Sequence, residues 1–487
     1  MIKSIEHRDG IYKQLVQTIA GSDEYNILKT NLTTFNRIIN ISKRALKKSY
    51  YANKFLEHKS NIKRTWQLIN EVVGKNSSKS ISDRFLVNNT TITEPIDIAN
   101  HFNTFFASIG HTLSLNIKQH DDINFEHYLK DRSTSNFEFL HTNSDDIVSI
   151  IGKLPAKKST GHDGISTELL KTLCDIISPT ISVIINKCFE SGIYPEEMKL
   201  SKAKPLYKKG DPTLLNNYRP ISLLPSISKV FERVMINQIY NYFCTNSLLT
   251  PSQHGFRKNH STELAAVELI DRVTRLLENN ETPFNIYIDL SKAFDTLNHN
   301  ILLSKLKFYG LSNKALILIE SYLTNRKQFC EYNYEKSSIL SITTGVPQGS
   351  TLGPLFFSIY INDMINCSDK FQFLMYADDT TLCSTIEKFD DNLHDTDYTN
   401  ENISREVTKL TTWLEVNKLS INETKTKVMI FYMPPKQVTL PIITLNDTQL
   451  EIVDTFNFLG ININKSLKWK PHVDIMCNKV LKYIAVI

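Results

Sequence analysis

The chain of 487 residues has no apolar run long enough for a transmembrane helix, which needs about 18 residues or more. Its opening segment, MIKSIEHRDG, is too polar for a secretory signal peptide. Neither glycine (15) nor proline (16) is in excess, and there is no tandem repeat or low-complexity tract. These absences argue against membrane and fibrous classes and predict an intracellular globular protein, in the nucleus or the cytoplasm, without a membrane partner.

The seven cysteines are scattered and include no CxxC pair. Nothing in their spacing therefore suggests a zinc site or a disulfide framework. We expect reduced thiols that lie mostly in the core.

Positive charge is concentrated near the N-terminus. From Lys29 to Arg64 the chain has ten Lys or Arg and one acid, Glu57, a local charge of +9; because the whole chain carries +5, the remainder carries −4. Apolar residues recur at helical spacing over residues 24–58, which predicts a long basic amphipathic helix. Such a charge run is often only a solvated face, but its density here favours contact with nucleic acid.

Further helices follow. A second helix is predicted to stop at Gly74, and the polar segment GKNSSKSISD reads as a connection. A third helix is predicted to begin near Pro95 and stop at Gly110, with a looser linker over residues 111–140. Ser144, followed by two acids, predicts the helix start that opens the densely patterned main domain.

Two adjacent carboxylates, Asp378 and Asp379, stand in the segment MYADDT. Apolar residues alternate before them and a threonine-rich strand pattern follows, so we expect the pair at the tip of a β-hairpin. An Asp-Asp pair at a turn usually only accepts backbone hydrogen bonds. A bound divalent cation would offset the repulsion between the two charges, and it would call for a third carboxylate at a neighbouring strand end.

Asp289 is the best candidate for that third carboxylate. Alternating apolar residues predict a strand over 284–290 with Asp289 at its end, and a helix after it that is capped by Gly310. A lone Asp at a strand end is more often a turn or helix cap.

The segment TTGVPQGSTLGPLFFSIYINDM, residues 343–364, contains three glycines that would let the backbone approach a ligand closely, and Pro354 then leads a helix. Alone, this pattern is also typical of a simple strand-to-helix turn.

Together these segments resemble a known family. YIDLSKAFD, GVPQGSTLGP, YADDT, WLEVNKLSINETKTKVM and FNFLG look like the palm motifs of reverse transcriptases from non-long-terminal-repeat (LINE-like) retrotransposons. Upstream, KSTGHDGIS, KKGDPTLLNNYRPISLL and QHGFRKNHST resemble their finger motifs. The resemblance covers roughly residues 140–465, with no motif missing or out of order, and several motifs in register are far more specific than one.

The resemblance implies an α+β right-hand polymerase fold with fingers, an antiparallel palm sheet and a partial thumb. It implies an RNA-directed DNA polymerase, a nucleotidyltransferase that extends a DNA primer with dNTPs on an RNA template. The implied domains are a helical basic linker that binds nucleic acid (1–140), fingers (141–262), palm (263–435) and the start of a thumb (436–487).

The resemblance also implies two Mg²⁺ ions, with Mn²⁺ as an alternative. Asp289 and Asp378 would bridge them, Asp379 would be a further ligand or electrostatic support, and the backbone carbonyl of Leu290 would complete one shell.

For the incoming nucleotide the family pattern implies that Phe294 blocks a ribose 2′-hydroxyl, although a plain core phenylalanine is the alternative. Gln348 and Gly349 would lie in the loop under the nucleotide. The implied primer grip is Phe458, Leu459 and Gly460.

Cationic residues complete the implied site. Arg219, with Lys208 or Lys209 near it, would bind the triphosphate. Lys425 corresponds to a general acid for pyrophosphate, although the neighbouring Lys427 could be confused with it.

Two features depart from the family pattern. Nothing resembles the endonuclease that usually precedes the basic helices, and the chain stops at KYIAVI, barely into the thumb. We therefore expect an endonuclease that is separate or missing, and a fragment or decayed copy of an element. The alternative hypothesis is a catalytically inactive RNA-binding remnant, whereas Phe294 and Ala377 argue against an RNA-dependent RNA polymerase.

Overall fold

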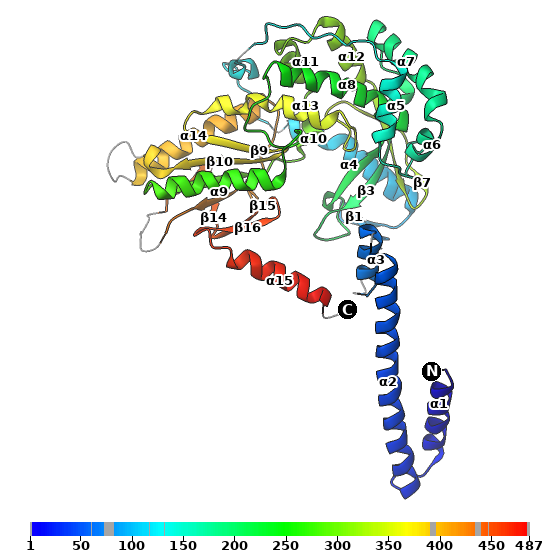
Figure 1. Cartoon of the computed structure of the whole chain (residues 1–487). Helices are drawn as coiled ribbons and strands as arrows, with labels where there is room; N and C mark the ends of the chain where they lie inside the picture. The colour runs from blue at the N-terminus through cyan, green and yellow to red at the C-terminus, as the bar shows by residue number, and fades with distance from the viewer. Residues whose placement is uncertain are drawn as a thin grey trace. The chain divides into compact units, whose positions relative to one another are not determined.

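The computed structural model of the chain describes residues 2–59, 61–72, 82–115, 117–130, 132–389, 396–433, 440–446 and 448–484. Helices and sheets are both present, which confirms the predicted α+β class. The chain divides into two compact units, Met1–Ile81 with Lys470–Ile487, and Ser82–Trp469 (Figure 1). The predicted division into linker, fingers, palm and thumb stays a prediction.

The first unit is helical. Its elements are α1 (Ile2–Gln17), α2 (Asp23–Glu57), α3 (Ile62–Val72) and α15 (Lys470–Ile484). The predicted basic helix is confirmed as α2, which begins where the Ser22 hydroxyl accepts a hydrogen bond from the Tyr25 N–H. The predicted stop at Gly74 and most of the connection after it lie outside the described residues.

A five-stranded sheet forms the centre of the second unit, in the order β14-β11-β5-β10-β9. Its strands are β5 (Pro283–Ile288), β9 (Gln372–Tyr376), β10 (Asp379–Thr385), β11 (Lys427–Ile430) and β14 (Glu451–Ile452). Neighbours are antiparallel except β11 and β14, which are parallel. All six residues of β5 are buried, because helices or a hairpin cover both faces of this central strand. The predicted strand and the predicted hairpin are thus confirmed.

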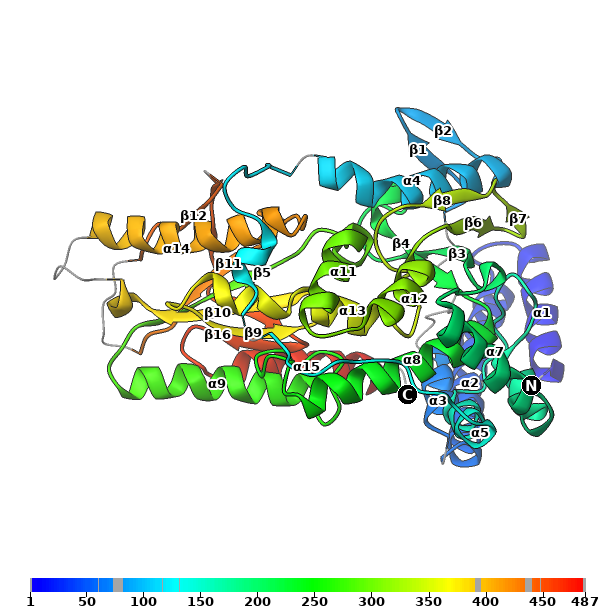
Figure 2. The ribbon, with the colours of Figure 1, turned by 90° about the horizontal axis from the view of Figure 1, so that it is seen from above.

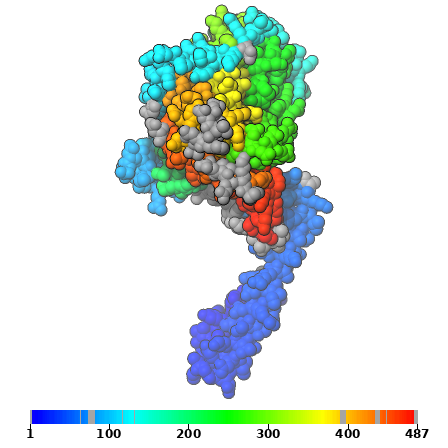
Figure 3. Space-filling model, turned by 90° about the vertical axis from the view of Figure 1, so that its left-hand side faces the viewer, coloured from blue at the N-terminus to red at the C-terminus, as the bar shows by residue number. Residues whose placement is uncertain are grey.

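The two faces of the central sheet have separate apolar cores, and Figure 2 shows helices along both sides of this sheet. Ile286 and neighbouring residues face α13 (Gly353–Tyr360) and α14 (Thr396–Val416). On the other face, Tyr287 packs with α9 (Thr262–Glu278) and with the hairpin of β15 (Thr455–Phe458) and β16 (Ile461–Asn464). Figure 3 shows α9, in green, and α14, in orange, reaching the same outer face of this unit.

A second sheet has the order β4-β3-β6-β7, with β8 also paired to β6. Its strands are β3 (Leu200–Tyr207), β4 (Tyr218–Leu223), β6 (Arg326–Tyr332), β7 (Glu335–Lys336) and β8 (Leu340–Ile342). Helix α4 (Pro95–Leu115) packs against β6, β7 and β8. The small hairpin of β1 (Phe85–Val87) and β2 (Thr90–Ile92) precedes α4.

The remaining helices of this unit are α5 (Ser144–Lys153), α6 (Thr167–Thr172), α7 (Cys174–Ser191), α8 (Ser226–Thr245), α10 (Ala293–Thr296), α11 (His299–Phe308) and α12 (Asn313–Leu323). Short 3-10 helices are η1 (Phe125–Tyr128), η2 (Glu196–Met198), η3 (Leu215–Asn217), η4 (Asn362–Cys367) and η5 (Ile386–Lys388), and β12 (Thr444–Leu445) pairs with β13 (Thr448–Gln449). The predicted start of α5 is confirmed, although Asn143 rather than Ser144 caps it. No helix among the described residues combines the length and apolar character needed to cross a bilayer.

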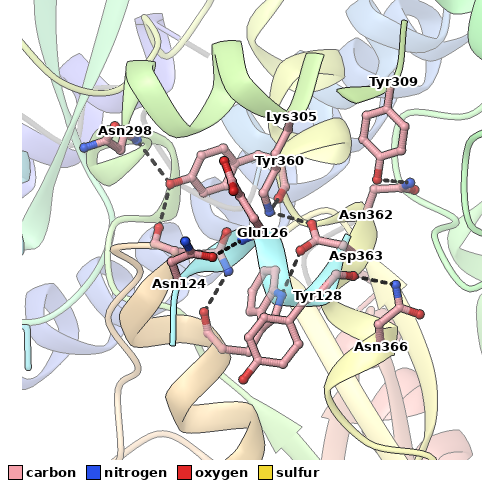
Figure 4. A network of polar contacts seen from close by, with 12 residues as sticks. Asn124, Glu126, Tyr128, Asn298, Lys305, Tyr309, Tyr360, Asn362, Asp363 and Asn366 are labelled. Atoms are coloured by element: carbon pink, nitrogen blue, oxygen red, sulfur yellow. Dashed lines mark hydrogen bonds and ion pairs between the residues drawn. The ribbon is translucent and has the colours of Figure 1, made fainter. Parts of the chain in front are cut away.

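One prediction about the segment before α5 is wrong. Helix α4 starts at Pro95 as predicted but continues past Gly110, whose missing side chain lets the helix pack tightly: a Cβ there would lie 2.0 Å from the Asp295 carbonyl oxygen. After the end of α4, the described part of residues 111–140 contains no helix or strand except the short η1, in agreement with the predicted looser linker. Tyr128 is buried, and its carbonyl accepts a hydrogen bond from the Asn366 side chain at 2.9 Å (Figure 4).

A buried polar network links α11, η4 and α14 (Figure 4). The Lys305 ammonium donates to the Tyr360 carbonyl at 2.6 Å and to the Asp363 carboxylate at 2.5 Å. The other carboxylate oxygen of Asp363 accepts a hydrogen bond from the Trp413 indole at 3.0 Å. The Tyr360 hydroxyl donates to the Asn417 carbonyl at 2.6 Å, so the network also fixes the loop that follows α14.

Candidate active site

The three predicted carboxylates meet at one end of the central sheet. Ile288 and Thr380 form the last registered pair of β5 and β10, so the next residues, Asp289 and Asp379, stand side by side. Asp378 belongs to the two-residue turn of the β9–β10 hairpin. The third carboxylate therefore lies at the neighbouring strand end, where the sequence analysis expected it.

The hairpin turn is supported by the segment that resembles a finger motif. Ala377 has φ = 58°, a left-handed conformation that is uncommon for alanine. The Gln253 side-chain carbonyl accepts hydrogen bonds from the Ala377 N–H at 3.1 Å and from the Gly255 N–H at 2.7 Å. A Cβ on Gly255 would lie 2.2 Å from the Ala377 nitrogen. The sequence pattern of QHGF alone does not reveal this role, in which Gln253 and Gly255 hold the turn that carries Asp378.

The carboxylates influence one another electrostatically. The pKa of Asp379 is raised to about 6, first by partial loss of water around the carboxyl and then by the charges of Asp378 and Asp289. Lys208 and Arg219 partly offset this effect. As the side chains stand, no three His, Cys, Asp or Glu among the described residues are grouped tightly enough to hold a metal ion. The donor set nevertheless fits one chemically, because three hard carboxylates lie at one end of the sheet and a divalent cation would relieve their repulsion.

Lys425 lies beside these acids. Its ammonium is 3.2 Å from the Asp289 carboxylate, and both side chains are substantially exposed. The Asp289 carbonyl accepts a hydrogen bond from the Asn422 N–H at 2.7 Å, which holds the loop after α14 against the end of β5. Lys427 instead pairs with Glu451 at 2.6 Å. Of the two lysines that the sequence could confuse, Lys425 is therefore the one at the carboxylates.

A cavity of about 620 Å³ opens in front of the carboxylates, and Asp289 and Asp378 line it. Its cationic lining residues are Lys208, Lys209, Arg219, Lys292 and Lys425. The pKa of Lys208 is lowered, mainly by burial and then by the nearby Arg219 and Lys425 charges. Such a cluster of cations facing carboxylates suits a polyanionic ligand such as a phosphate chain.

The predicted loop residues Gln348 and Gly349 also line the cavity. The Gln348 side-chain amide donates to both carboxylate oxygens of Asp295, at 2.9 and 2.8 Å, and the Gln348 backbone carbonyl accepts from the Ser222 N–H at 2.8 Å. Gly349 has φ = 130°, and a Cβ there would lie 2.5 Å from the Ser222 carbonyl oxygen. The glycine therefore permits close approach to β4, in addition to any approach to a ligand.

A buried glutamate fixes the next turn of this loop. One carboxylate oxygen of Glu232, on α8, accepts hydrogen bonds from the Thr351 and Leu352 N–H groups at 2.5 and 3.2 Å. The other accepts from the Tyr322 hydroxyl at 3.2 Å. Burial raises the pKa of Glu232, and these hydrogen bonds oppose that shift. No local sequence signal marks Glu232, because it lies in an ordinary helix far along the chain from the loop.

Phe294 belongs to both the cavity and the core. It lines the cavity, while its ring centroid lies 4.7 Å from that of Phe357 and 6.3 Å from that of Phe256. Leu290 lines the same cavity with a buried side chain.

The predicted primer-grip residues lie elsewhere. Phe458 ends β15, and Leu459 and Gly460, both with positive φ, form the turn to β16. This hairpin packs on the Tyr287 face of the central sheet, where the Phe456 ring stacks on Tyr287 at 3.8 Å. By the alternation of β5, Asp289 belongs to that same face, but the hairpin residues are not part of the cavity lining.

Comparison with known proteins identifies relatives over most of this unit. A family profile described as "Reverse transcriptase (RNA-dependent DNA polymerase)" matches residues 206–463, more than half of the chain. The chain is 27% identical over 356 residues to the RNA-directed DNA polymerase from mobile element jockey of Drosophila melanogaster, covering 72% of this chain and 38% of that protein.

A second relative is the probable RNA-directed DNA polymerase from transposon BS of the same species, 30% identical over 347 residues, or 68% of this chain and 36% of that protein. A Pol polyprotein from the type-1 retrotransposable element R1 of Bradysia coprophila is 24% identical over 354 residues. The chain spans little more than a third of the length of the first two relatives.

Proposed function

Because the chain belongs to the reverse transcriptase (RNA-dependent DNA polymerase) family, we propose that it is an RNA-directed DNA polymerase of a non-long-terminal-repeat retrotransposon. It would extend a DNA primer with dNTPs on an RNA template. The observation that carries the proposal is the strand register that sets Asp289 beside Asp379 and the turn residue Asp378, at the mouth of a cation-lined cavity.

Members of this family generally use divalent metal ions, and we propose two Mg²⁺ ions here, with Mn²⁺ as an alternative. Asp289, Asp378 and Asp379, with the Leu290 carbonyl, are the residues that would hold them. When bound, such ions stabilise charge on the attacking and leaving oxygens of an in-line displacement. The ion pair between Lys425 and Asp289 is exposed, so it contributes little free energy to stability. Asp289 could therefore exchange Lys425 for a metal ion at low cost.

The positions of the other cavity-lining residues suggest how each would act on the incoming nucleotide. Arg219 on β4, with Lys208 and Lys209, would bind the triphosphate. Lys425 would donate a proton to the pyrophosphate as it leaves, since its ammonium already lies at the carboxylates. Phe294 would exclude a ribose 2′-hydroxyl, because its ring packs against Phe357 and would disturb the core if it moved away from the cavity.

We further propose the right-hand arrangement for the second unit, with the β5–β10 sheet as palm, the β3–β4 sheet in the fingers and the β15–β16 hairpin as primer grip. Basic residues of α2 would bind the nucleic-acid backbone. On α2 the ammonium groups of Lys47 and Lys54 lie 6.0 and 5.4 Å from the rings of Tyr51 and Tyr50, so this part of the helix presents cations and aromatic rings together. The expected location, nucleus or cytoplasm, is part of the same proposal.

Primer extension tests the proposal. The wild-type chain should add dNTPs to a DNA primer annealed to RNA in the presence of Mg²⁺, and Asp378→Ala should abolish extension. Asp271→Ala is the matched control, because Asp271 forms an exposed ion pair with Arg275 on α9. Extension by Asp378→Ala at the wild-type rate would refute the assignment.

The alternative of an inactive RNA-binding remnant is not favoured. A decayed site would be expected to lose some of its acids, cations or supporting contacts. Here the acids Asp289, Asp378 and Asp379 lie together, with Lys425 beside them and Gln253 holding the turn.

A further inference from the structure

We propose that Lys292 is a further phosphate-binding residue of this site, which contacts the phosphate chain of the incoming nucleotide. The inference rests on the proposed function and adds to it a phosphate contact from the residue that immediately precedes α10. Lys292 lies three residues after Asp289 and lines the same cavity as Arg219 and Lys208.

The backbone at Lys292 is held in an unusual conformation. Its φ is 50° and its ψ is 42°, in the left-handed region that side chains other than those of Gly, Asn and Asp rarely adopt. The Lys292 carbonyl accepts the Asp295 N–H at 2.8 Å and starts the short helix α10. Strain of this kind persists where the surroundings fix a residue, and it is common at ligand sites.

The ammonium of Lys292 has weak partners. It lies 5.7 Å from the centre of the Phe105 ring and donates one long hydrogen bond, 3.5 Å, to the Tyr218 carbonyl. The side chain is half-buried, and the acid that acts on it electrostatically, Asp295, has both carboxylate oxygens hydrogen-bonded to the Gln348 side chain. A half-buried cation that makes only a long hydrogen bond gains free energy when an anion enters its cavity.

The neighbours indicate what that anion is. Lys208, Arg219 and Lys425 line the same cavity as Lys292. Together these side chains carry more positive charge than a single phosphate group would neutralise. A chain of several phosphates matches such a group, and it is the part of a dNTP that all four bases share.

A helix outside the matched family region sets this position. Phe105, Ile109 and Leu113 of α4 line the cavity, whereas the family profile begins at residue 206. Gly110 lets α4 pack directly on the backbone at Asp295, which puts the Phe105 ring against the Lys292 ammonium. The aromatic ring stabilises the cation without accepting a conventional hydrogen bond, so the N–H groups that do not donate to Tyr218 stay available to a ligand in the cavity.

Direct ligand binding tests this inference separately from turnover. We would measure, by calorimetry, the affinity of the full chain on an RNA–DNA duplex for dTTP in Ca²⁺, for inorganic tripolyphosphate and for thymidine. Lys292→Met keeps the aliphatic stem, Lys292→Gln is a second neutral variant, and Lys292→Arg restores the charge. Lys229→Met is the matched control, because Lys229 is a partly buried lysine that is not among the cavity-lining residues.

Both neutral variants should bind dTTP and tripolyphosphate about 10- to 100-fold more weakly, as expected for loss of a hydrogen bond to a charged group. Thymidine affinity should not change, Lys292→Arg should recover most of the loss, and Lys229→Met should match the wild type. Equal dTTP affinity in wild type, Lys292→Met and Lys292→Gln would overturn the role of Lys292 and leave the proposed function standing. Lys292-dependent binding without primer extension would count against the polymerase alone, and no dTTP binding by the wild type would overturn both.

Discussion

Replacing Lys305 by methionine should strongly destabilise the second unit. Lys305 and Asp363 are almost completely buried, at 0% and 1% side-chain exposure, and their ion pair joins α11 to η4. The ammonium also lies 5.0 and 5.1 Å from the ring centres of Tyr360 and Trp413. Methionine has a similar length and fills the space, so the variant isolates the loss of the charge and its hydrogen bonds.

The size of the effect follows from what is left behind. After Lys305→Met, the Asp363 carboxylate keeps its hydrogen bond from the Trp413 indole but loses its counter-charge. Removing one partner of a buried pair costs about 3–5 kcal/mol, because the remaining charge stays buried and unpaired. Adding Asp363→Asn removes that charge and keeps an acceptor for the indole, so the double variant should recover about half of the loss or more.

Trp413 itself reports the result. In a background with Trp66→Phe and Trp469→Phe, fluorescence of Trp413 follows unfolding of the second unit in denaturant without a signal from the first. Arg275→Met is the control, because its pair with Asp271 is exposed and should be worth less than about 1 kcal/mol. A loss below about 1 kcal/mol for Lys305→Met, or a double variant less stable than the single one, would refute the reasoning.

Three further predictions concern the cavity. Phe294→Ala should reduce the preference for dNTPs over rNTPs about 10- to 100-fold, measured as the ratio of kcat/KM values, because the ring no longer fills the space beside the ribose; an unchanged ratio would contradict the gate. Burial raises the pKa of Asp295 to about 6, so its stabilising contribution is complete below about pH 4 and is lost as the pH rises through 6. Unfolding free energies of wild type and Asp295→Asn should therefore diverge by about 2–3 kcal/mol over that range, with the wild type losing stability as pH rises; parallel profiles would count against it. Gly110→Ala should cost about 1–3 kcal/mol and reduce extension, since its Cβ would meet the Asp295 carbonyl, whereas Gly152→Ala, with nothing within 4 Å, should be neutral or stabilising.

Local patterns in the sequence predicted the parts of the site that depend on local structure. Period-two alternation placed Asp289 at the end of β5 and the pair Asp378 and Asp379 at the tip of a hairpin, and the strand register bears this out. Proline at a first turn placed the start of α4 correctly. These predictions succeeded because a strand end or a helix start is encoded within a few residues.

Long-range packing explains what the sequence did not show. Gly110 looked like a helix terminator, yet it is a contact point inside α4 for a segment far along the chain. Asp295 lies within a quoted motif, but its partner, the Gln348 side chain, is 53 residues away. The β1–β2 hairpin was also missed, although the adjacent Asn88 and Asn89, both with positive φ, are a turn signal that could have found it.

Binding of Mn²⁺ is the most direct test of the central claim, that three carboxylates from distant segments converge to hold divalent cations. Electron paramagnetic resonance should detect Mn²⁺ bound to the wild-type chain in the presence of dTTP, displaced by excess Mg²⁺. Asp289→Asn and Asp378→Asn should each weaken that binding about tenfold or more, whereas Asp271→Asn should leave it unchanged. Wild-type Mn²⁺ affinity in Asp289→Asn and Asp378→Asn would contradict the account.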